Sequence, residues 1–184
     1  MTSRFAPALA TLALSACAAL PKDQPVFEQL DADTGVTIAR LGKPVELYRE
    51  TVSSATADRF AFLAPFETNQ MGKREYFLWL AVPVDPTLAS SVPSVDVDGS
   101  AVTLSPPGRA ADFAGLANSP YKAPAPWSAL YYFKADGDLI ARLGNAQSLA
   151  IRMLEPTKDG PAEAQFTLKI VADPRLKEFA ARAN

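Results

Sequence analysis

Tyr76-Phe77-Leu78-Trp79-Leu80-Ala81-Val82 is the most continuously apolar stretch of this chain after its N-terminal segment. Such a run, closed by Pro83, is typical of a strand that is covered on both faces. Because side chains alternate across a strand, Phe77 and Trp79 point to one face, and Tyr76, Leu78 and Leu80 point to the other. The stretch therefore predicts the central strand of a β-rich core.

Upstream of this run, the sequence predicts a hairpin and an edge strand. The alternating segments 36–41 and 45–49 flank Gly42-Lys43 and predict a first hairpin. The apolar segment 59–66 predicts a strand. Pro65 within it predicts a sheet edge or a strand end, because proline cannot donate to a β-ladder.

Downstream, turn residues separate further strands. Asp98-Gly99 lies between alternating apolar residues and predicts a tight hairpin over 95–104, since both central residues of a type I′ turn need positive φ. Alternating or apolar segments predict three more strands, at 129–133, 148–154 and 164–171.

Two short helices are also predicted. The first covers 138–143, with Asp136 or Asp138 as its N-cap and Gly144 as a left-handed stop. The second begins at Asp173-Pro174, where an aspartate can cap and a proline fits the first turn.

Nine strands and two short helices indicate a mainly β fold. We expect an antiparallel β-sandwich or a strongly curved sheet, with one of the helices at the C-terminus. An α+β domain with both helices on one face is the alternative. The length of the chain suits one globular domain, which we place at residues 26–184.

The N-terminus has the parts of a secretory signal. Arg4 supplies a positive charge, and the apolar stretch 5–14 that follows is too short to cross a bilayer as a helix, which needs ~20 residues. The residues Leu14-Ser15-Ala16-Cys17 then resemble the lipobox of bacterial lipoproteins. That resemblance implies cleavage before Cys17 and a lipid on its thiol. An ordinary signal peptide cut nearby, for example after Ala19, is the alternative.

The lipoprotein resemblance implies a division of the chain and a location. Residues 1–16 would be the signal peptide, and residues 17–25 would be the lipidated N-terminus and a short tether. Lipoproteins with aspartate after the cysteine tend to stay at the inner membrane. Here that residue is Ala18, which favours the outer membrane. We expect a protein of the bacterial cell envelope that contacts the membrane through its N-terminal lipid.

Several classes of function are disfavoured by composition. The chain has no histidine, and Cys17 is its only cysteine, which excludes His/Cys zinc sites, thiol nucleophiles on the mature domain and Ser-His-Asp triads. The formal net charge is −2 and no basic stripe is present, so we expect no nucleic-acid partner.

Residues 31–35 resemble the start of a calcium loop, but Gly35 and Gly42 break the required spacing. Residues 31–35 therefore predict a polar turn. For the chain as a whole, we expect no cofactor.

The proline-rich segment 105–127 is the best candidate for a binding surface. A loop of this length in a compact domain is often functional, and Phe113, Tyr121 and Trp127 could supply contact area to a partner. The alternative is that these aromatic side chains fold inward and plug one end of the domain.

Three functions are consistent with these features. We expect a non-enzymatic binding module that presents a surface to another envelope protein, a polymer or an apolar ligand. A hydrolase or transferase that uses carboxylates or Lys/Tyr is the second hypothesis, and it needs an acid such as Glu67, Glu75 or Asp112 beside another polar group in a cleft. A structural accessory lipoprotein with a flat apolar patch is the third.

Overall fold

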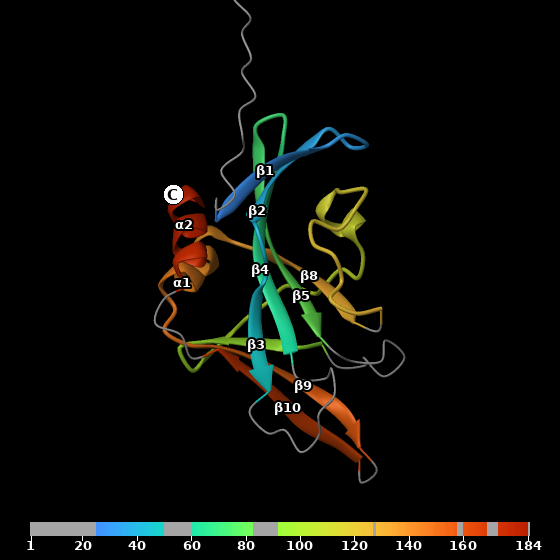
Figure 1. Ribbon diagram of the computed structural model, residues 1–184, viewed down its shortest axis with the longest axis vertical. Helices are drawn as coiled ribbons and strands as arrows, with labels where there is room; N and C mark the ends of the chain where they lie inside the picture. The colour runs from blue at the N-terminus through green and yellow to red at the C-terminus, as the bar shows by residue number, and fades with distance from the viewer. Residues whose placement is uncertain are drawn as a thin grey trace, which may run out of the picture.

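The computed structural model describes residues 25–49, 60–82, 92–126, 128–157, 160–168 and 173–183 (Figure 1). The strands in these ranges are β1 (Val26–Asp31), β2 (Val36–Leu41), β3 (Val45–Arg49), β4 (Phe60–Gln70), β5 (Lys73–Val82), β6 (Ser94–Val97), β7 (Ser100–Val102), β8 (Ala129–Ala135), β9 (Leu149–Thr157) and β10 (Gly160–Leu168). The helices are α1 (Gly137–Asn145), α2 (Pro174–Ala183) and the 3₁₀ helix η2 (Ala111–Ala114). The mainly β fold with a C-terminal helix is confirmed.

The strands form two antiparallel layers. The first layer has the order β1-β2-β4-β5-β8, and the second has the order β3-β10-β9-β6-β7. Strand β3 also pairs with the first half of β4 and so joins the two layers. Within the described residues the strands do not close into a barrel.

The predicted hairpin between 36–41 and 45–49 is wrong. Strands β2 and β3 run in the same direction along one edge of β4, with Arg40 opposite Phe66 and Val45 opposite Leu63. Residues 41–44 therefore face only residues 64–65, so the β2–β3 segment is bulged at this point. A bulge bends its strand, and here it sends β2 toward β1 and β3 toward β10.

The prediction that Pro65 marks a sheet edge or a strand end is also wrong. Strand β4 continues to Gln70 and has neighbours on both sides. Pro65 lies opposite the bulge, where the ladder between β4 and the β2–β3 segment is already interrupted. Its missing N–H therefore costs no ladder hydrogen bond, which is why proline is tolerated at bulges.

A strand that the sequence does not predict, β1, pairs with β2. Its residues lack the alternation of apolar and polar side chains on which strand prediction depends, so only the register with β2 defines it. Residues 32–35 join the two strands as the predicted polar turn, closed by the Gly35 N–H, which donates to the Asp31 carbonyl oxygen at 2.8 Å.

Both helices begin where the sequence predicts. The Asp136 side chain caps α1 by accepting the Leu139 N–H at 2.7 Å, and the Asp173 side chain accepts the Arg175 N–H at 2.9 Å before α2. The predicted role of Gly144 is wrong, because this residue lies inside α1. A Cβ on Gly144 would be 2.4 Å from the Ala180 Cβ, so the glycine allows α1 and α2 to pack closely.

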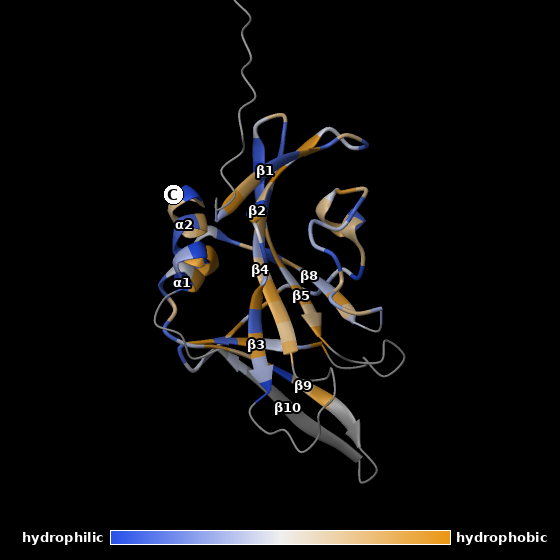
Figure 2. Cartoon of the chain, viewed as in Figure 1, coloured by the Kyte–Doolittle hydropathy of each residue, from blue (hydrophilic) through white to orange (hydrophobic). Residues whose placement is uncertain are grey.

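The predicted central strand is β5, and both of its faces are buried. Cross-strand register defines an inner face, which includes Leu63, Leu78 and Phe133 and faces the main core. The opposite, outer face includes Phe66, Phe77, Trp79 and Tyr132. Figure 2 shows apolar residues along β4 and β5 and on the packed sides of α1 and α2.

The two-residue turn at Asp98-Gly99 joins β6 and β7 as predicted, with φ of 52° and 75°.

Candidate functional site

The outer face of β4, β5 and β8 is covered by residues 103–126, which we call the strap. It contains η2 and otherwise little regular structure, and Figure 1 shows it beside β5 and β8. Gly108 pairs with Tyr132 through two main-chain hydrogen bonds of 2.8 and 3.0 Å, which attach the strap to the edge of β8. The strap thus forms a third layer and explains why the central strand is apolar on both faces.

Tyr121 holds the strap to the sheet from within. It is only 5% exposed, and its ring lies 5.1 Å from that of Trp79. Its hydroxyl accepts the Leu41 N–H at 3.0 Å and donates to the Pro65 carbonyl oxygen at 3.1 Å. Burial raises the pKa of this hydroxyl, so it stays protonated. These contacts show that the Tyr121 side chain folds inward and plugs the domain, which was the alternative to an exposed binding residue.

A second attachment joins the strap to the β1–β2 turn. The Asp31 carboxylate accepts the Ala117 N–H at 2.9 Å and the Asp33 N–H at 3.1 Å. These main-chain donors, Ala117 first, hold the pKa of Asp31 below its ordinary value. Ser119 adds a third point, since its hydroxyl accepts from the Tyr132 hydroxyl at 2.8 Å.

Phe113 is the strap aromatic that reaches solvent. It is 40% exposed, and its ring lies edge-on to Phe77 with the centroids 6.2 Å apart. The ring packs on the backbone of Gly108, where an added Cβ would be 2.2 Å from the Phe113 Cγ. The side chain is therefore held in place on one side and open to solvent on the other.

Next to Phe113 is a cleft of about 200 Å³. Its walls come from β2, β4, β5, the strap and β8, and the lining residues are Val36, Thr68, Gln70, Lys73, Glu75, Phe77, Phe113, Ala114, Gly115 and Lys134. One Glu75 oxygen lies 2.8 Å from the Lys134 ammonium and 3.3 Å from that of Lys73. The hydrogen bond from Lys134, together with Lys73, lowers the pKa of Glu75. Two cations against one anion leave the cleft with a net positive charge.

The carboxylates considered for catalysis do not come together. Glu75 lies opposite Thr68 and so is on the outer face, whereas Glu67 lies opposite Tyr76 on the inner face. Glu67 is buried and bound at 2.7 Å by two nitrogens of Arg74. Asp112 lies in η2 and does not line the cleft. The cleft therefore contains one carboxylate, that of Glu75, which two lysines keep ionised. A general acid would instead need a carboxyl group with a raised pKa.

Arg74 and Tyr76 instead secure the C-terminal helix. Arg74 donates to the Arg182 carbonyl oxygen at 2.8 Å, and the Tyr76 hydroxyl donates to that of Ala183 at 3.4 Å. The Arg182 side chain in turn pairs with Glu28 on β1. Glu67 thus belongs to the cluster that holds α2 against the sheet.

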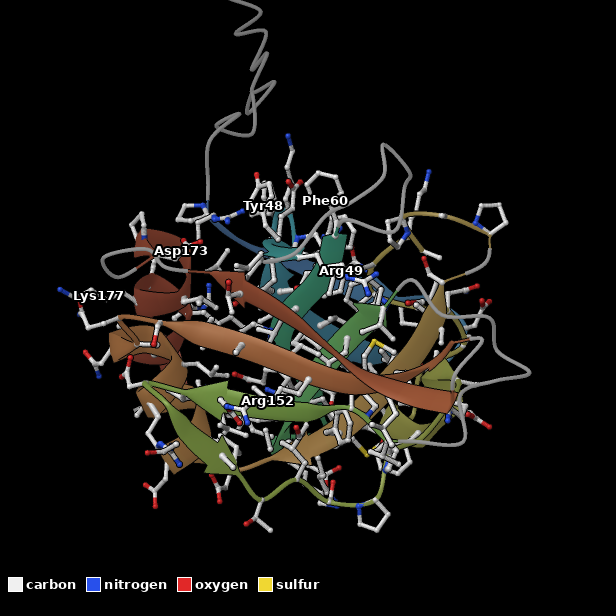
Figure 3. The ribbon with its side chains drawn as sticks, turned by 90° about the horizontal axis from the view of Figure 1, so that it is seen from below. Tyr48, Arg49, Phe60, Arg152, Asp173 and Lys177 are labelled. Carbon is white, nitrogen blue, oxygen red and sulfur yellow. The ribbon has the colours of Figure 1, made fainter. Side chains whose placement is uncertain are left out.

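A second exposed feature on the outer face was not predicted from the sequence. Tyr48 and Phe60 are cross-strand partners with ring centroids 5.1 Å apart, and Phe62 is 6.5 Å from Phe60. Tyr48 is 54% exposed, and Figure 3 shows it beside Phe60 on one side of the molecule. We call these three residues the aromatic strip. It becomes visible only once the register of β3 on β4 is known.

Two of the predicted site residues, Cys17 and Trp127, lie outside the described residues. Within the described ranges, no group of three or more potential metal ligands from Cys, Asp and Glu is present. No helix of the described chain has the length and apolar character needed to span a membrane.

Comparison of the chain with family models, with curated proteins and with solved structures finds no match in any of the three.

Proposed function

We propose that this chain is a lipid-anchored protein of the bacterial envelope that acts as a non-enzymatic binding module. The lipobox-like residues 14–17 support the anchor, and Ala18 supports the outer membrane as its location. Removal of residues 1–16 would leave Cys17 at the N-terminus, with its thiol used by the lipid.

The observation that carries the binding role is the cleft beside Phe113. A half-exposed aromatic ring, held by Gly108 and Phe77, adjoins the ammonium groups of Lys73 and Lys134. An apolar wall beside a net positive charge suits a ligand or partner segment that carries an anionic group next to an apolar one. The separation of Glu67 from Glu75 on opposite faces gives no support to a carboxylate-pair enzyme.

Site-specific photocrosslinking tests this proposal in cells. A photoreactive phenylalanine analogue at Phe113 should yield a discrete adduct with an envelope component, and the same analogue at Leu154, exposed on β9, should not. Lys73→Glu, which reverses the charge at the rim, should reduce the Phe113 adduct. The absence of an adduct, together with turnover of an envelope substrate by the purified protein, would overturn the proposal.

The aromatic strip favours a second candidate, the structural accessory lipoprotein. Tyr48, Phe60 and Phe62 form a row of rings on adjacent strands, which suits a flat contact with a larger assembly. Under this alternative, Tyr48→Ser would release the protein from an envelope complex, as measured by native size separation, and Phe113→Ala would not. Release by Phe113→Ala but not by Tyr48→Ser would instead support the cleft as the binding site.

A further inference from the structure

The turn between β4 and β5 places an unfavourable residue at its tip. Met71 and Gly72 both have positive φ, 52° and 87°, and join the paired residues Gln70 and Lys73. This is the pattern of a type I′ turn, for which asparagine, aspartate and glycine are preferred. The corresponding turn between β6 and β7 has the preferred Asp98 at the same position.

Met71 is also fully exposed, so burial does not explain it. The turn is stabilised by its neighbours instead, because the Asn69 side chain accepts the Gly72 N–H at 3.0 Å. A long apolar side chain thus occupies a position that disfavours it both by conformation and by exposure. Such local conflicts are expected at functional positions.

Leu30 is a second exposed apolar residue at this end of the molecule. It is 65% exposed, and the cross-strand register places Leu30, Thr37 and Asn69 in one row across β1, β2 and β4. Figure 1 shows the β4–β5 turn and the β1–β2 hairpin at one end of the molecule and the β9–β10 hairpin at the other. Lys73, an exposed cation, follows Gly72 directly.

The length of the tether allows this end to reach a membrane. Val26 lies opposite Leu41, which Tyr121 links to Pro65, and Met71 lies six residues beyond Pro65 along β4 and its turn. At the strand rise, these residues span about 20 Å. Cys17 precedes Pro25 by eight residues, which can extend to about 26–29 Å. A lipid on Cys17 therefore leaves enough chain for Met71 to contact the same bilayer.

We propose that the end of the domain formed by Met71, Leu30 and Lys73 rests on the lipid bilayer. This inference depends on the proposed lipidation of Cys17. Met71 and Leu30 enter the interfacial layer, while Lys73 remains among the anionic headgroups. Because the anchor makes contact an intramolecular event, a small apolar area is sufficient to orient the domain. The cleft, whose wall includes Gln70 and Lys73, then opens at the level of the membrane surface.

Fluorescent labelling of the mature lipidated protein in vesicles of phosphatidylethanolamine and phosphatidylglycerol tests this orientation. Lipidation consumes Cys17, the only cysteine, so Met71→Cys provides a unique thiol for an environment-sensitive dye. We expect its emission to shift to shorter wavelength and to be quenched by lipids with spin-labelled acyl chains. The same dye on Leu154→Cys, at the opposite end, should show neither effect.

A second pair of variants tests the contribution of Met71 itself. A dye on Leu30→Cys should be quenched in the parent chain and should lose that quenching when Met71→Asn is added. Asparagine suits the turn, so a folding defect is not expected. Equal quenching of the dyes at residues 71 and 154, or none at either, in protein whose mass confirms the lipid would overturn the orientation only. A mass without lipid would overturn the proposed function and this inference together.

Discussion

The Tyr121 hydroxyl donates a hydrogen bond to the carbonyl oxygen of Pro65, 56 residues earlier in the chain, at 3.1 Å. The same hydroxyl accepts the Leu41 N–H, so one side chain from the strap connects two main-chain groups at the bulge between β4 and the β2–β3 segment. The strap is thus attached to the sheet at this point, and Phe113 is the strap aromatic residue that stays partly exposed to solvent.

Removal of this hydroxyl should destabilise the domain. Tyr121→Phe keeps the ring against Trp79 but leaves the buried Leu41 N–H and Pro65 carbonyl without their partner. A loss of about 1–3 kcal/mol in the free energy of unfolding is expected, measured by chemical denaturation. Tyr48→Phe, on an exposed tyrosine, is the matched control and should change stability by less than about 0.5 kcal/mol. Equal stability of the two variants would contradict the role given to Tyr121.

Gly144→Ala should destabilise the domain although alanine is the better helix former. Helix propensity alone would favour alanine by about 1 kcal/mol. The new Cβ would instead lie 2.4 Å from the Ala180 Cβ and 3.2 Å from the Leu176 carbonyl oxygen. Overpacking of this kind costs about 1–3 kcal/mol. Thermal melts should show a lower Tm, partly restored by adding Ala180→Gly. A raised Tm in the single variant would show that α1 and α2 can separate freely.

Met71→Asn should stabilise the domain. Asparagine tolerates the positive φ at residue 71, whereas a methionine there pays a steric cost of about 1–2 kcal/mol. A gain of about 1 kcal/mol would raise Tm by about 2–4 °C in a domain of this size. Asp98→Met, in the equivalent turn between β6 and β7, should lower Tm for two reasons, because methionine disfavours the positive φ and because the carboxylate that accepts the Gln147 and Ser148 N–H groups is lost. An unchanged or lower Tm for Met71→Asn would show that methionine is not the strained residue in its turn.

Acid should weaken the attachment of the strap. The Ala117 N–H lowers the pKa of Asp31 in the folded state, so this carboxylate contributes stability that is complete above its unfolded pKa of about 3.9. That contribution is lost as the pH falls through the lower folded pKa. The contribution of Glu75 to stability is lost in acid in the same way, because the hydrogen bond from Lys134 lowers the pKa of Glu75. Denaturation from pH 7 to pH 2 should show a decline below about pH 4, and Asp31→Asn should make this decline shallower. Parallel curves for the two proteins would contradict the assignment.

The fold could be predicted where a local pattern decided it. The central strand β5, the Asp98-Gly99 turn and the Asp136 and Asp173 caps follow from periodicity and turn chemistry within a few residues. The hairpin predicted at Gly42-Lys43 was wrong because it, too, was inferred from local turn chemistry alone. A bulge and a hairpin turn look alike in sequence, and only the pairing of both flanking strands with β4 distinguishes them.

The candidate site was less predictable, because it depends on long-range contacts. The sequence indicated the strap and left open whether its aromatic residues are exposed. The answer differs between Phe113 and Tyr121, since Tyr121 reaches the bulge whereas Phe113 is held at the surface by Gly108. Lys73 and Glu75 share a face of β5 by the alternation of the strand alone, but Lys134 joins them only through the register of β5 on β8, which no local pattern encodes.

The proposed lipid anchor is tested by the mass of the intact mature protein, extracted from the membranes of its native host. We expect a chain that begins at residue 17 and carries a diacylglyceryl group on the Cys17 thiol, and we expect that Cys17→Ser is no longer processed to this form. A chain that begins at another residue, with the Cys17 thiol free or removed, would contradict the lipid anchor and the function built on it.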